Sequence, residues 1–214
     1  MERLPKGRHG LSQEYVARNQ RERLIAALVQ VIDEVGWRNT TVAMVSKRAG
    51  VSKSDFYRHF ESKDDCFLAA YDRAVEHVHA GVAGACLAHD GAAWSPRIRD
   101  GIAALIATLQ ADPPLARLAL VEGLRVGRGA YDRYQAALAG FVPYLRDGAP
   151  SPPLGDGLPP TTHEAVVGGI ASLIGRQVRT RGVERLGELL PDVVEFALTP
   201  YVGAREARRI TSGA

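Results

Sequence analysis

A short predicted helix places several hydrogen-bond donors on one side. Residues 52–60 have the sequence Ser-Lys-Ser-Asp-Phe-Tyr-Arg-His-Phe. If the two phenylalanines, Phe56 and Phe60, face a core, helical periodicity turns the polar residues between them the other way. The outward side then holds a lysine, a serine, a tyrosine and an arginine: Lys53, Ser54, Tyr57 and Arg58.

These donors suit the chemistry of double-stranded DNA. Lys53 and Arg58 could donate to O6 and N7 of guanine, and Ser54 could bond several bases. Donors that suit phosphate oxygens follow close by, and the N–H groups of a helix beginning near 62–64 would assist them. These phosphate candidates are Tyr57, His59 and Lys63. The alternatives are a core position for Tyr57 and a purely solvated helix start for Lys63.

Local signals define two short helices around these residues. Thr40 and Thr41 offer an N-cap for a helix that ends at Gly50. Ser52 has the N-cap position of the next helix, with Asp55 at capping-box spacing. Val51 and Phe56 also have the spacing of a hydrophobic staple. Helices over 41–49 and 52–60, joined by a tight glycine turn, have helix-turn-helix dimensions. In that motif the second helix enters the major groove.

The stretch from 36 to 64 resembles the signature of TetR-family transcriptional regulators. Its sequence is GWRNTTVAMVSKRAGVSKSDFYRHFESKD. The family pattern is roughly G-aromatic-x-x-T-T-V-x-x-I-A-x-x-A-G-V-S-x-x-x-apolar-Y-x-H-F-x-x-K-E. The departures are mild: Val45 replaces Ile, Ser46 replaces Ala and Asp64 replaces Glu.

This resemblance implies roles for individual residues. Lys53, Ser54 and Arg58 fall at base-contacting positions. Phosphate contacts would come from Thr41, Tyr57, His59 and Lys63. Ala43 stands where some members place a longer base-contacting side chain, so base contacts from the first helix of the motif are expected to be weak. The larger helical part would bind a small ligand, and its last two long helices would form a dimer interface.

Charge is distributed unevenly along the 214 residues. The chain has 27 Lys and Arg against 24 Asp and Glu, a net charge of +3. Residues 1–63 hold 12 basic and 7 acidic residues, whereas 64–214 hold 15 and 17. A basic N-terminal unit on a mildly acidic body suggests a polyanionic partner at one end. The sequence shows neither an apolar run of membrane-spanning length nor a signal-peptide pattern, so we expect a cytoplasmic protein without a membrane partner.

The whole sequence has a helical pattern, and we predict an all-α fold. An N-terminal three-helix DNA-binding domain is expected over 1–62, beginning with a basic arm (1–12) that contains Arg3, Lys6 and Arg8. A larger effector-binding and dimerisation domain is expected over 63–214. Ser95 and Pro96 are expected to open one helix, and 204–214 to fray. Further helices are predicted over 14–35, 64–89, 130–146, 161–181 and 183–198, with a loop over 148–160.

Two residue sets in the second domain have predicted roles. Small residues on one helix would let two helices approach closely, and the resemblance assigns them to the dimer interface; packing within one chain is the alternative. They are Gly168, Gly169, Ala171, Ser172 and Gly175. Aromatic and polar residues of the kind that line ligand pockets could equally be ordinary core and surface. These are Trp94, Glu122, Arg125, Tyr131, Tyr134 and Phe141.

Other chemistry finds little support. Cys66 and Cys86 lie on one predicted helix, roughly 30 Å apart, which is too far for a disulfide. They lack zinc-site spacing, and His77 and His79 point to different sides of their helix. No hydrolase, metalloprotease or phosphate-loop motif occurs. We therefore predict no metal site, no cofactor and no enzymatic activity.

The combined prediction is a ligand-responsive DNA-binding regulator. It would bind a pseudo-palindromic, double-stranded DNA operator as a homodimer. In its simplest form it would be a repressor that a small-molecule effector releases from DNA. The alternative is a DNA-binding activator or architectural protein that needs no ligand.

Overall fold

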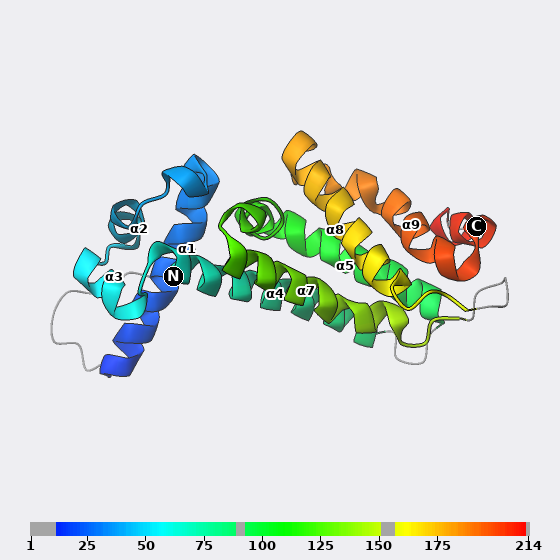
Figure 1. Cartoon of the computed structure of the whole chain (residues 1–214), viewed down its shortest axis with the longest axis horizontal. Helices are drawn as coiled ribbons and strands as arrows, with labels where there is room; N and C mark the ends of the chain where they lie inside the picture. The colour runs from blue at the N-terminus through cyan, green and yellow to red at the C-terminus, as the bar shows by residue number, and fades with distance from the viewer. Residues whose placement is uncertain (1–11, 89–92, 151–156, 213–214) are drawn as a thin grey trace.

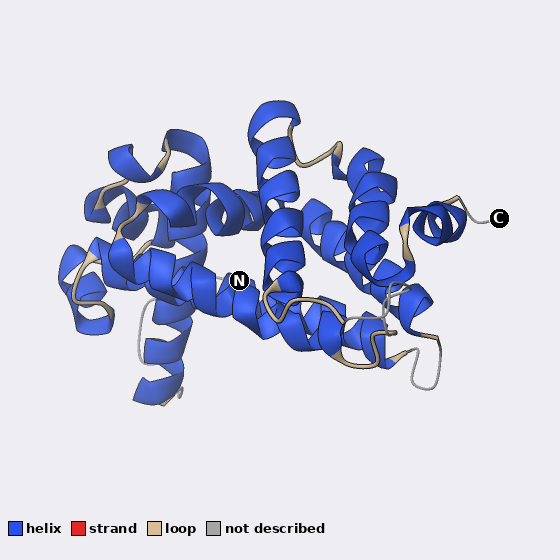
Figure 2. Cartoon of the chain, turned by 45° about the vertical axis from the view of Figure 1, so that its right-hand side comes forward, coloured by secondary structure: helices blue, strands red, loops and turns tan. Residues whose placement is uncertain are grey.

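The computed structural model describes residues 12–88, 93–150 and 157–212, and every regular element within these ranges is helical (Figure 2). The prediction of an all-α fold is confirmed. None of the described helices is both long and apolar enough to cross a bilayer. The elements run in this order: α1 Gln13–Val35, η1 Trp37–Asn39, α2 Val42–Ala49, α3 Lys53–His59, α4 Lys63–Leu87, α5 Trp94–Ala111, α6 Pro113–Arg117, η2 Leu118–Glu122, η3 Gly123–Arg125, α7 Arg128–Arg146, α8 Thr162–Arg181, η4 Leu186–Leu189, α9 Leu190–Val202 and α10 Ala204–Thr211.

Helices α1 to α3 form the N-terminal unit, at the left of Figure 1. Their ends follow the predicted local signals. The hydroxyl of Thr41 accepts a hydrogen bond from the N–H of Met44 (3.3 Å), and that of Ser52 accepts one from Asp55 (3.0 Å). Gly50 ends α2 in the left-handed conformation, at a φ of 63°. Caps therefore set the boundaries of both short helices.

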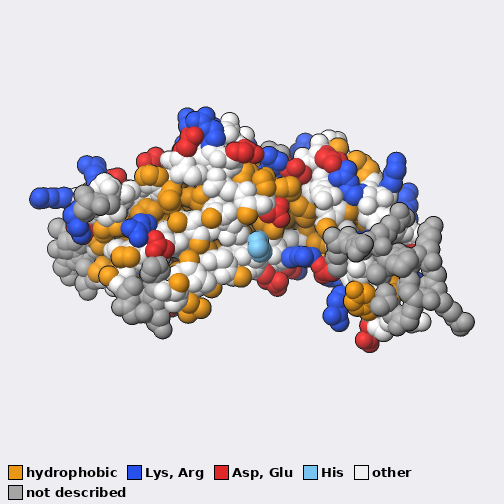
Figure 3. Space-filling model, turned by 180° about the vertical axis from the view of Figure 1, so that it is seen from behind, with side chains coloured by type: hydrophobic (Ala, Val, Ile, Leu, Met, Phe, Trp, Pro, Cys, Tyr) orange, Lys and Arg blue, Asp and Glu red, His pale blue; other side chains and the backbone are white. Residues whose placement is uncertain are grey.

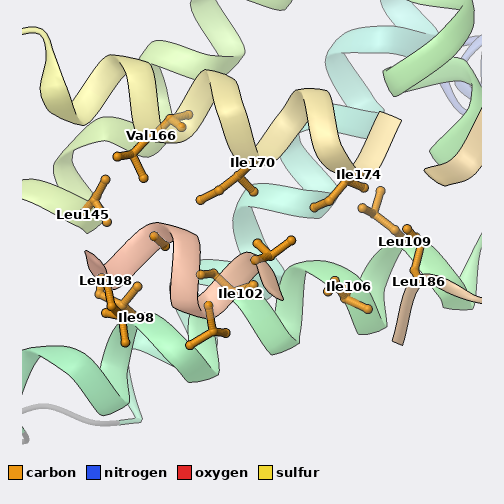
Figure 4. Packing of buried hydrophobic residues seen from close by; sticks show 14 of the residues in the cluster. Ile98, Ile102, Ile106, Leu109, Leu145, Val166, Ile170, Ile174, Leu186 and Leu198 are labelled. Atoms are coloured by element: carbon orange, nitrogen blue, oxygen red, sulfur yellow. The ribbon is translucent and has the colours of Figure 1, made fainter. Parts of the chain in front are cut away.

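Helices α4 to α10 form the helical body. Helix α4 leaves the N-terminal unit and runs lengthwise along the body, with α5 and α7 packed against it (Figure 1). Helices α8 and α9 lie together on the opposite side from α4. Isoleucines of α5, such as Ile102 and Ile106, belong to the same buried cluster as Ile170 and Ile174 of α8, and this cluster forms the core of the body (Figure 4).

The buried residues form two clusters that meet within α4. Its first half, from Cys66 to Ala74, packs with the core of the N-terminal unit, whereas Val78 belongs to the core of the body. Leu118 and Ala119 of η2 also join the N-terminal cluster. Packing thus continues across residue 62, and the domain boundary there stays a prediction. The predicted basic arm lies outside the described residues.

Three helix boundaries in the body differ from the predictions. The start of α5 was placed at Ser95, but α5 begins at Trp94, whose indole N–H donates to the Leu145 carbonyl (2.9 Å). The segment expected to fray instead forms α10, because Ala207 is fully buried against the body. The helix predicted from 183 begins later, with Pro191 in the first turn of α9.

Charged side chains are concentrated towards the edges of the body rather than over its middle. On the face turned away from the viewer in Figure 1, hydrophobic side chains gather over the middle of the body, with Lys, Arg, Asp and Glu mostly towards its edges (Figure 3).

The two cysteines lie on α4 as expected, and both are free thiols. Burial raises the pKa of Cys66 to about 12, so this thiol stays protonated at neutral pH.

Candidate nucleic-acid interface and internal cavity

Two buried phenylalanines fix the orientation of α3. Phe56 is fully buried and Phe60 nearly so, with their ring centroids 5.6 Å apart. Because they occupy one side of a short helix, the predicted donors come to the other side. Exposed side chains there belong to Lys53, Ser54, Tyr57 and Arg58. The structure therefore brings these four residues together on one outward face.

The donors on this face are held only loosely. Arg58 lies 3.4 Å from the Asp55 carboxylate, and its side chain is 79% exposed. Exposed pairs of this kind contribute at most about 1 kcal/mol, so the guanidinium can exchange this contact for a ligand. The Ser54 hydroxyl lies 2.9 Å from that of Ser52. A hydrogen bond from Ser52, and secondly from Arg58, lowers the pKa of Asp55.

His59 is placed differently from its neighbours. Its Nε2 lies 3.1 Å from Oε1 of Gln20 on α1, and the ring is half-buried. Since an amide oxygen only accepts, Nε2 is the donor in this bond. Burial, followed by the charges of Arg21 and Arg58, lowers the pKa of His59, with Asp55 acting in the opposite direction. The neutral ring therefore joins α3 to α1.

Lys63 also points inward. Its ammonium donates to the carbonyls of Trp37 (3.2 Å) and Thr40 (2.9 Å), and it lies 3.9 Å from the centroid of the Trp37 ring. These contacts connect the start of α4 to η1. One of three ammonium donors is left for another acceptor. The sequence pattern did not indicate this structural role, which depends on a contact across more than twenty residues.

Two more residues bear on this surface. Thr41 is exposed at the start of α2, where its hydroxyl caps the helix. Arg21 of α1 stacks over Phe60, 5.0 Å from the ring centroid, and adds a positive charge beside α3. Sequence reasoning missed Arg21 because its proximity to α3 depends on packing between helices far apart in the chain.

A second feature is a cavity of about 140 Å³ inside the body, between α4, α5, η2, α7 and α8. Of its 22 lining residues, 16 are Val, Leu, Ile or Ala. Among the lining residues, the side-chain polar atoms are three tyrosine hydroxyls and one thiol, from Tyr71, Tyr134, Tyr144 and Cys86. Burial raises the pKa values of Tyr71, Tyr134 and Cys86, so these groups are neutral around pH 7.

The six predicted pocket residues are distributed between this cavity and other sites. Tyr134 and Phe141 line it. Trp94 does not, because its ring packs on Tyr201 and bonds the Leu145 carbonyl. Glu122 accepts from the backbone N–H of Trp37 (3.4 Å), and Tyr131 is half-exposed outside the cavity. The side chain of Arg125 lies outside the described part of the structure.

The small residues of α8 face in different directions. Gly168 has open space beside it, and Ser172 is exposed. Ala171 instead lines the cavity. Gly169 lies against Phe196 of α9, so closely that a Cβ would come within 2.6 Å of the ring, and a Cβ at Gly175 would lie 3.4 Å from the Leu120 carbonyl. Packing within the chain thus accounts for Gly169, Ala171 and Gly175, and leaves Gly168 and Ser172 available to a partner.

Several contacts join the cavity wall to the N-terminal unit. Arg117, next to η2, pairs with Asp33 of α1. Glu122, at the other end of η2, bonds the Trp37 backbone. Between them, η2 is a π-helical turn, a conformation that is rare and frequent at functional sites. Tyr71 stacks on Phe67 (6.2 Å between centroids), and Phe67 packs edge-on against Trp37 (5.0 Å).

Comparisons with known proteins agree with this geometry. Residues 24–70 match the family described as bacterial regulatory proteins, tetR family. The HTH-type transcriptional regulator BetI of Stenotrophomonas maltophilia is 38% identical over 64 residues, which are 30% of this chain and 33% of that protein. The N-terminal part of this chain is thus similar to the corresponding part of TetR-family regulators. The alignment spans only about a third of the length of this curated relative.

Solved structures extend the likeness in fold to most of the chain. The fatty acid degradation regulator FadR from Bacillus halodurans superimposes with a TM-score of 0.71 at 18% identity, covering 87% of this chain and 96% of that one. FadR from Bacillus subtilis, in complex with stearoyl-CoA, gives a TM-score of 0.63 at 18% identity, covering 84% and 98%. The N-terminal unit thus resembles its relatives in sequence, whereas the body resembles its neighbours in fold alone.

Proposed function

We propose that this protein is a homodimeric, ligand-responsive transcriptional regulator of the TetR family that represses by binding an operator. The observation that supports this most is the outward face of α3, where exposed and loosely held donors stand on a helix that two buried phenylalanines hold in place. Helix α3 would enter the major groove with this face toward the base edges.

Individual contacts follow from the side chains. Lys53 and Arg58 would donate to guanine O6 and N7, and Ser54 would bond a neighbouring base. Tyr57 and Thr41, at the edges of this face, would contact phosphates. His59 and Lys63 would support the surface, with a phosphate contact open to the remaining donor of Lys63.

Dimerisation would use the outer side of α8. Gly168 and Ser172 leave room for a close approach of a second helix, and Phe196 of α9, which lies against Gly169, is 40% exposed. A two-fold dimer places two α3 helices in related half-sites, so the operator would be pseudo-palindromic.

Release would follow from a ligand in the body. The apolar cavity supports this role, and the similar FadR structure from Bacillus subtilis is described as a complex with stearoyl-CoA. A ligand shifts the protein away from DNA only if it binds the non-binding conformation more tightly. The alternative of a ligand-independent activator or architectural protein is disfavoured by the cavity.

Selection from a random duplex DNA library tests the proposal. The purified protein would be incubated with the library at a salt concentration near 150 mM, because affinity without a stated salt is uninterpretable. We expect enrichment of a palindrome whose half-sites are about one helical turn apart or a multiple of it. Binding that falls with salt but enriches no sequence would contradict a regulator with an operator.

A further inference from the structure

The cavity in the body is long and narrow. On α4 its lining residues run from Tyr71 to Cys86, which are fifteen positions apart, or roughly 22 Å along a helix. Rows on α5 and α7 run beside them, from Ile98 to Leu109 and from Tyr134 to Leu145. A volume of about 140 Å³ spread over this length leaves a slender channel. This shape fits an unbranched chain better than a compact ring system.

The channel walls also select for a hydrocarbon. Valine, isoleucine and leucine side chains form most of the lining, including Val78, Val82 and Ile102. A polar group placed between them would lose its hydrogen bonds to water without replacement, which disfavours its binding there. The occupant of the middle of the channel should therefore be apolar and uncharged.

The two ends of the channel differ. Near the N-terminal unit it is closed by Tyr71, which is 2% exposed and packs so closely on Gly123 that a Cβ there would lie 2.7 Å from the ring. At the far end Cys86 is partly exposed, and the adjacent Leu87 is 72% exposed. This second end is therefore the nearer of the two to solvent.

A positive charge lies close to this far end, on Arg97, which is not itself one of the lining residues. Arg97 precedes Ile98 of the channel wall, and it is close enough to Cys86 for its charge to oppose the rise in the pKa of that thiol. One guanidinium nitrogen donates to the Asp147 carbonyl. Its buried Nε has no hydrogen-bond partner among the described residues. Arg97 therefore has both the charge and a donor for an anionic group.

We propose that the effector is a single unbranched hydrocarbon chain with an anionic head. The tail lies along α4 with its tip at Tyr71 and Leu120, and the head lies beside Arg97. This inference rests on the proposed function and adds the chemical class of the ligand and its direction in the channel. A free fatty acid and a fatty acyl-CoA share this chemistry.

This direction makes the protein sensitive to chain length. The tip of a long tail meets Leu120 of the π-helical turn η2 and the ring of Tyr71. Both belong to the contacts that join the body to the N-terminal unit, through Glu122 with Trp37 and through Phe67. Short chains leave this end empty, so they make no contact with η2 that could differ between two conformations of the protein. Only chains that reach it shift the protein between conformations.

Titration of the full-length protein with straight-chain saturated fatty acids of increasing length tests the inference. Each added methylene contributes about 0.8 kcal/mol of burial, so the dissociation constant should fall about fourfold per carbon until the channel is full. Operator release, measured with the selected DNA, should begin only near that length. Acyl-CoAs of the same chain lengths form a second arm of the experiment. Tighter binding of these compounds would identify the thioester, rather than the free fatty acid, as the effector.

Two substitutions locate the head and the tail. For Arg97→Gln we expect about tenfold or more weaker binding of the fatty acid, with no change for the alcohol of equal chain length. Ala137→Phe fills the channel wall and should move the length limit to shorter chains, whereas the exposed neighbour Ala136→Phe should not. Thermal unfolding checks that each variant is folded.

The outcomes separate the two proposals. Operator binding without any chain-length dependence, or equal losses for acid and alcohol in Arg97→Gln, would overturn the inference and leave the regulator intact. Chain binding with the predicted limit, but with no operator selected from the library, would support the ligand class and overturn the proposed function.

Discussion

The candidate functional groups lie on the outside of the N-terminal unit but in the interior of the helical body. On α3 the polar side chains face solvent, and the aromatic residues Phe56 and Phe60 are buried behind them. In the body the candidate site is internal, and its walls are the same apolar residues that form the core. An outward site depends on one helix and its caps, whereas an internal site depends on how several helices pack.

This difference changes what substitutions should do. On the outward face a side chain can be removed with little effect on folding, because it contacts mainly water. In the body every lining residue contributes to both the cavity and the core, so function and stability are coupled. The predictions below test whether the two regions can be separated in this way.

The largest effect is expected from Gly168→Arg on α8. No atom lies within 4 Å of a Cβ at Gly168, so the arginine fits the monomer, but it would block a partner helix. A monomer binds only one half-site and loses the affinity gained when two linked subunits bind together, so operator affinity should fall about 100-fold or more. Sedimentation and operator titration measure the two effects.

Gly84→Arg is the matched control for this substitution. Gly84 is also a helical glycine with open space beside it, on α4. It should leave the dimer and operator affinity unchanged. A dimeric Gly168→Arg variant would contradict the proposed interface and show that the body pairs, if at all, through another surface.

Arg58→Ala tests the outward face directly. Its guanidinium makes one long contact with Asp55, so stability should change by less than about 0.5 kcal/mol. Operator affinity should fall by ~1–3 kcal/mol with relaxed preference at one base position. Equal losses on operator and random DNA would refute base contact by Arg58, and a large loss of stability would refute the separation of function from folding in this unit.

The N-terminal unit could be predicted almost completely from sequence. Its helix ends depend on caps three or four residues from the groups they bond, as at Thr41 and Ser52. The polar side chains of α3 are then exposed because the two phenylalanines face the core. What sequence could not reveal are the inward contacts of His59 and Lys63, whose partners Gln20 and Thr40 lie more than twenty residues away.

The body could be predicted only in outline. Its helices were expected, but the start of α5 depends on the bond from Trp94 to Leu145, and α10 forms because Ala207 is buried. The cavity arises where five elements fail to fill the space between them. Of the residues chosen by type, Tyr134 and Phe141 line this cavity, but residue type gave no means to exclude Trp94 or Tyr131 from its lining.

Lys63→Met tests a residue of the N-terminal unit that does not follow the outward pattern. The substitution removes two hydrogen bonds to carbonyls and the contact with the Trp37 ring, so the free energy of unfolding should fall by about 1–2 kcal/mol. Urea denaturation measures this loss. If the third donor of Lys63 also meets a phosphate, the salt slope of DNA binding should fall by about 1. Unchanged stability would contradict the inward role.

The smallest effect concerns the pH dependence of the N-terminal unit through His59. Because burial lowers the pKa of His59 in the folded state, the unfolded chain binds the proton more readily. Stability from the neutral ring is thus present at high pH and is lost as the pH falls below about 6.5, the value for a free histidine. His59→Gln cannot titrate but can still bond Gln20. Urea denaturation between pH about 8 and about 5.5 should therefore show the wild type losing more stability than the variant. An equal dependence of stability on pH in the two proteins would mean that His59 is solvated like Arg58. The outward-facing polar side chains would then continue to the end of α3.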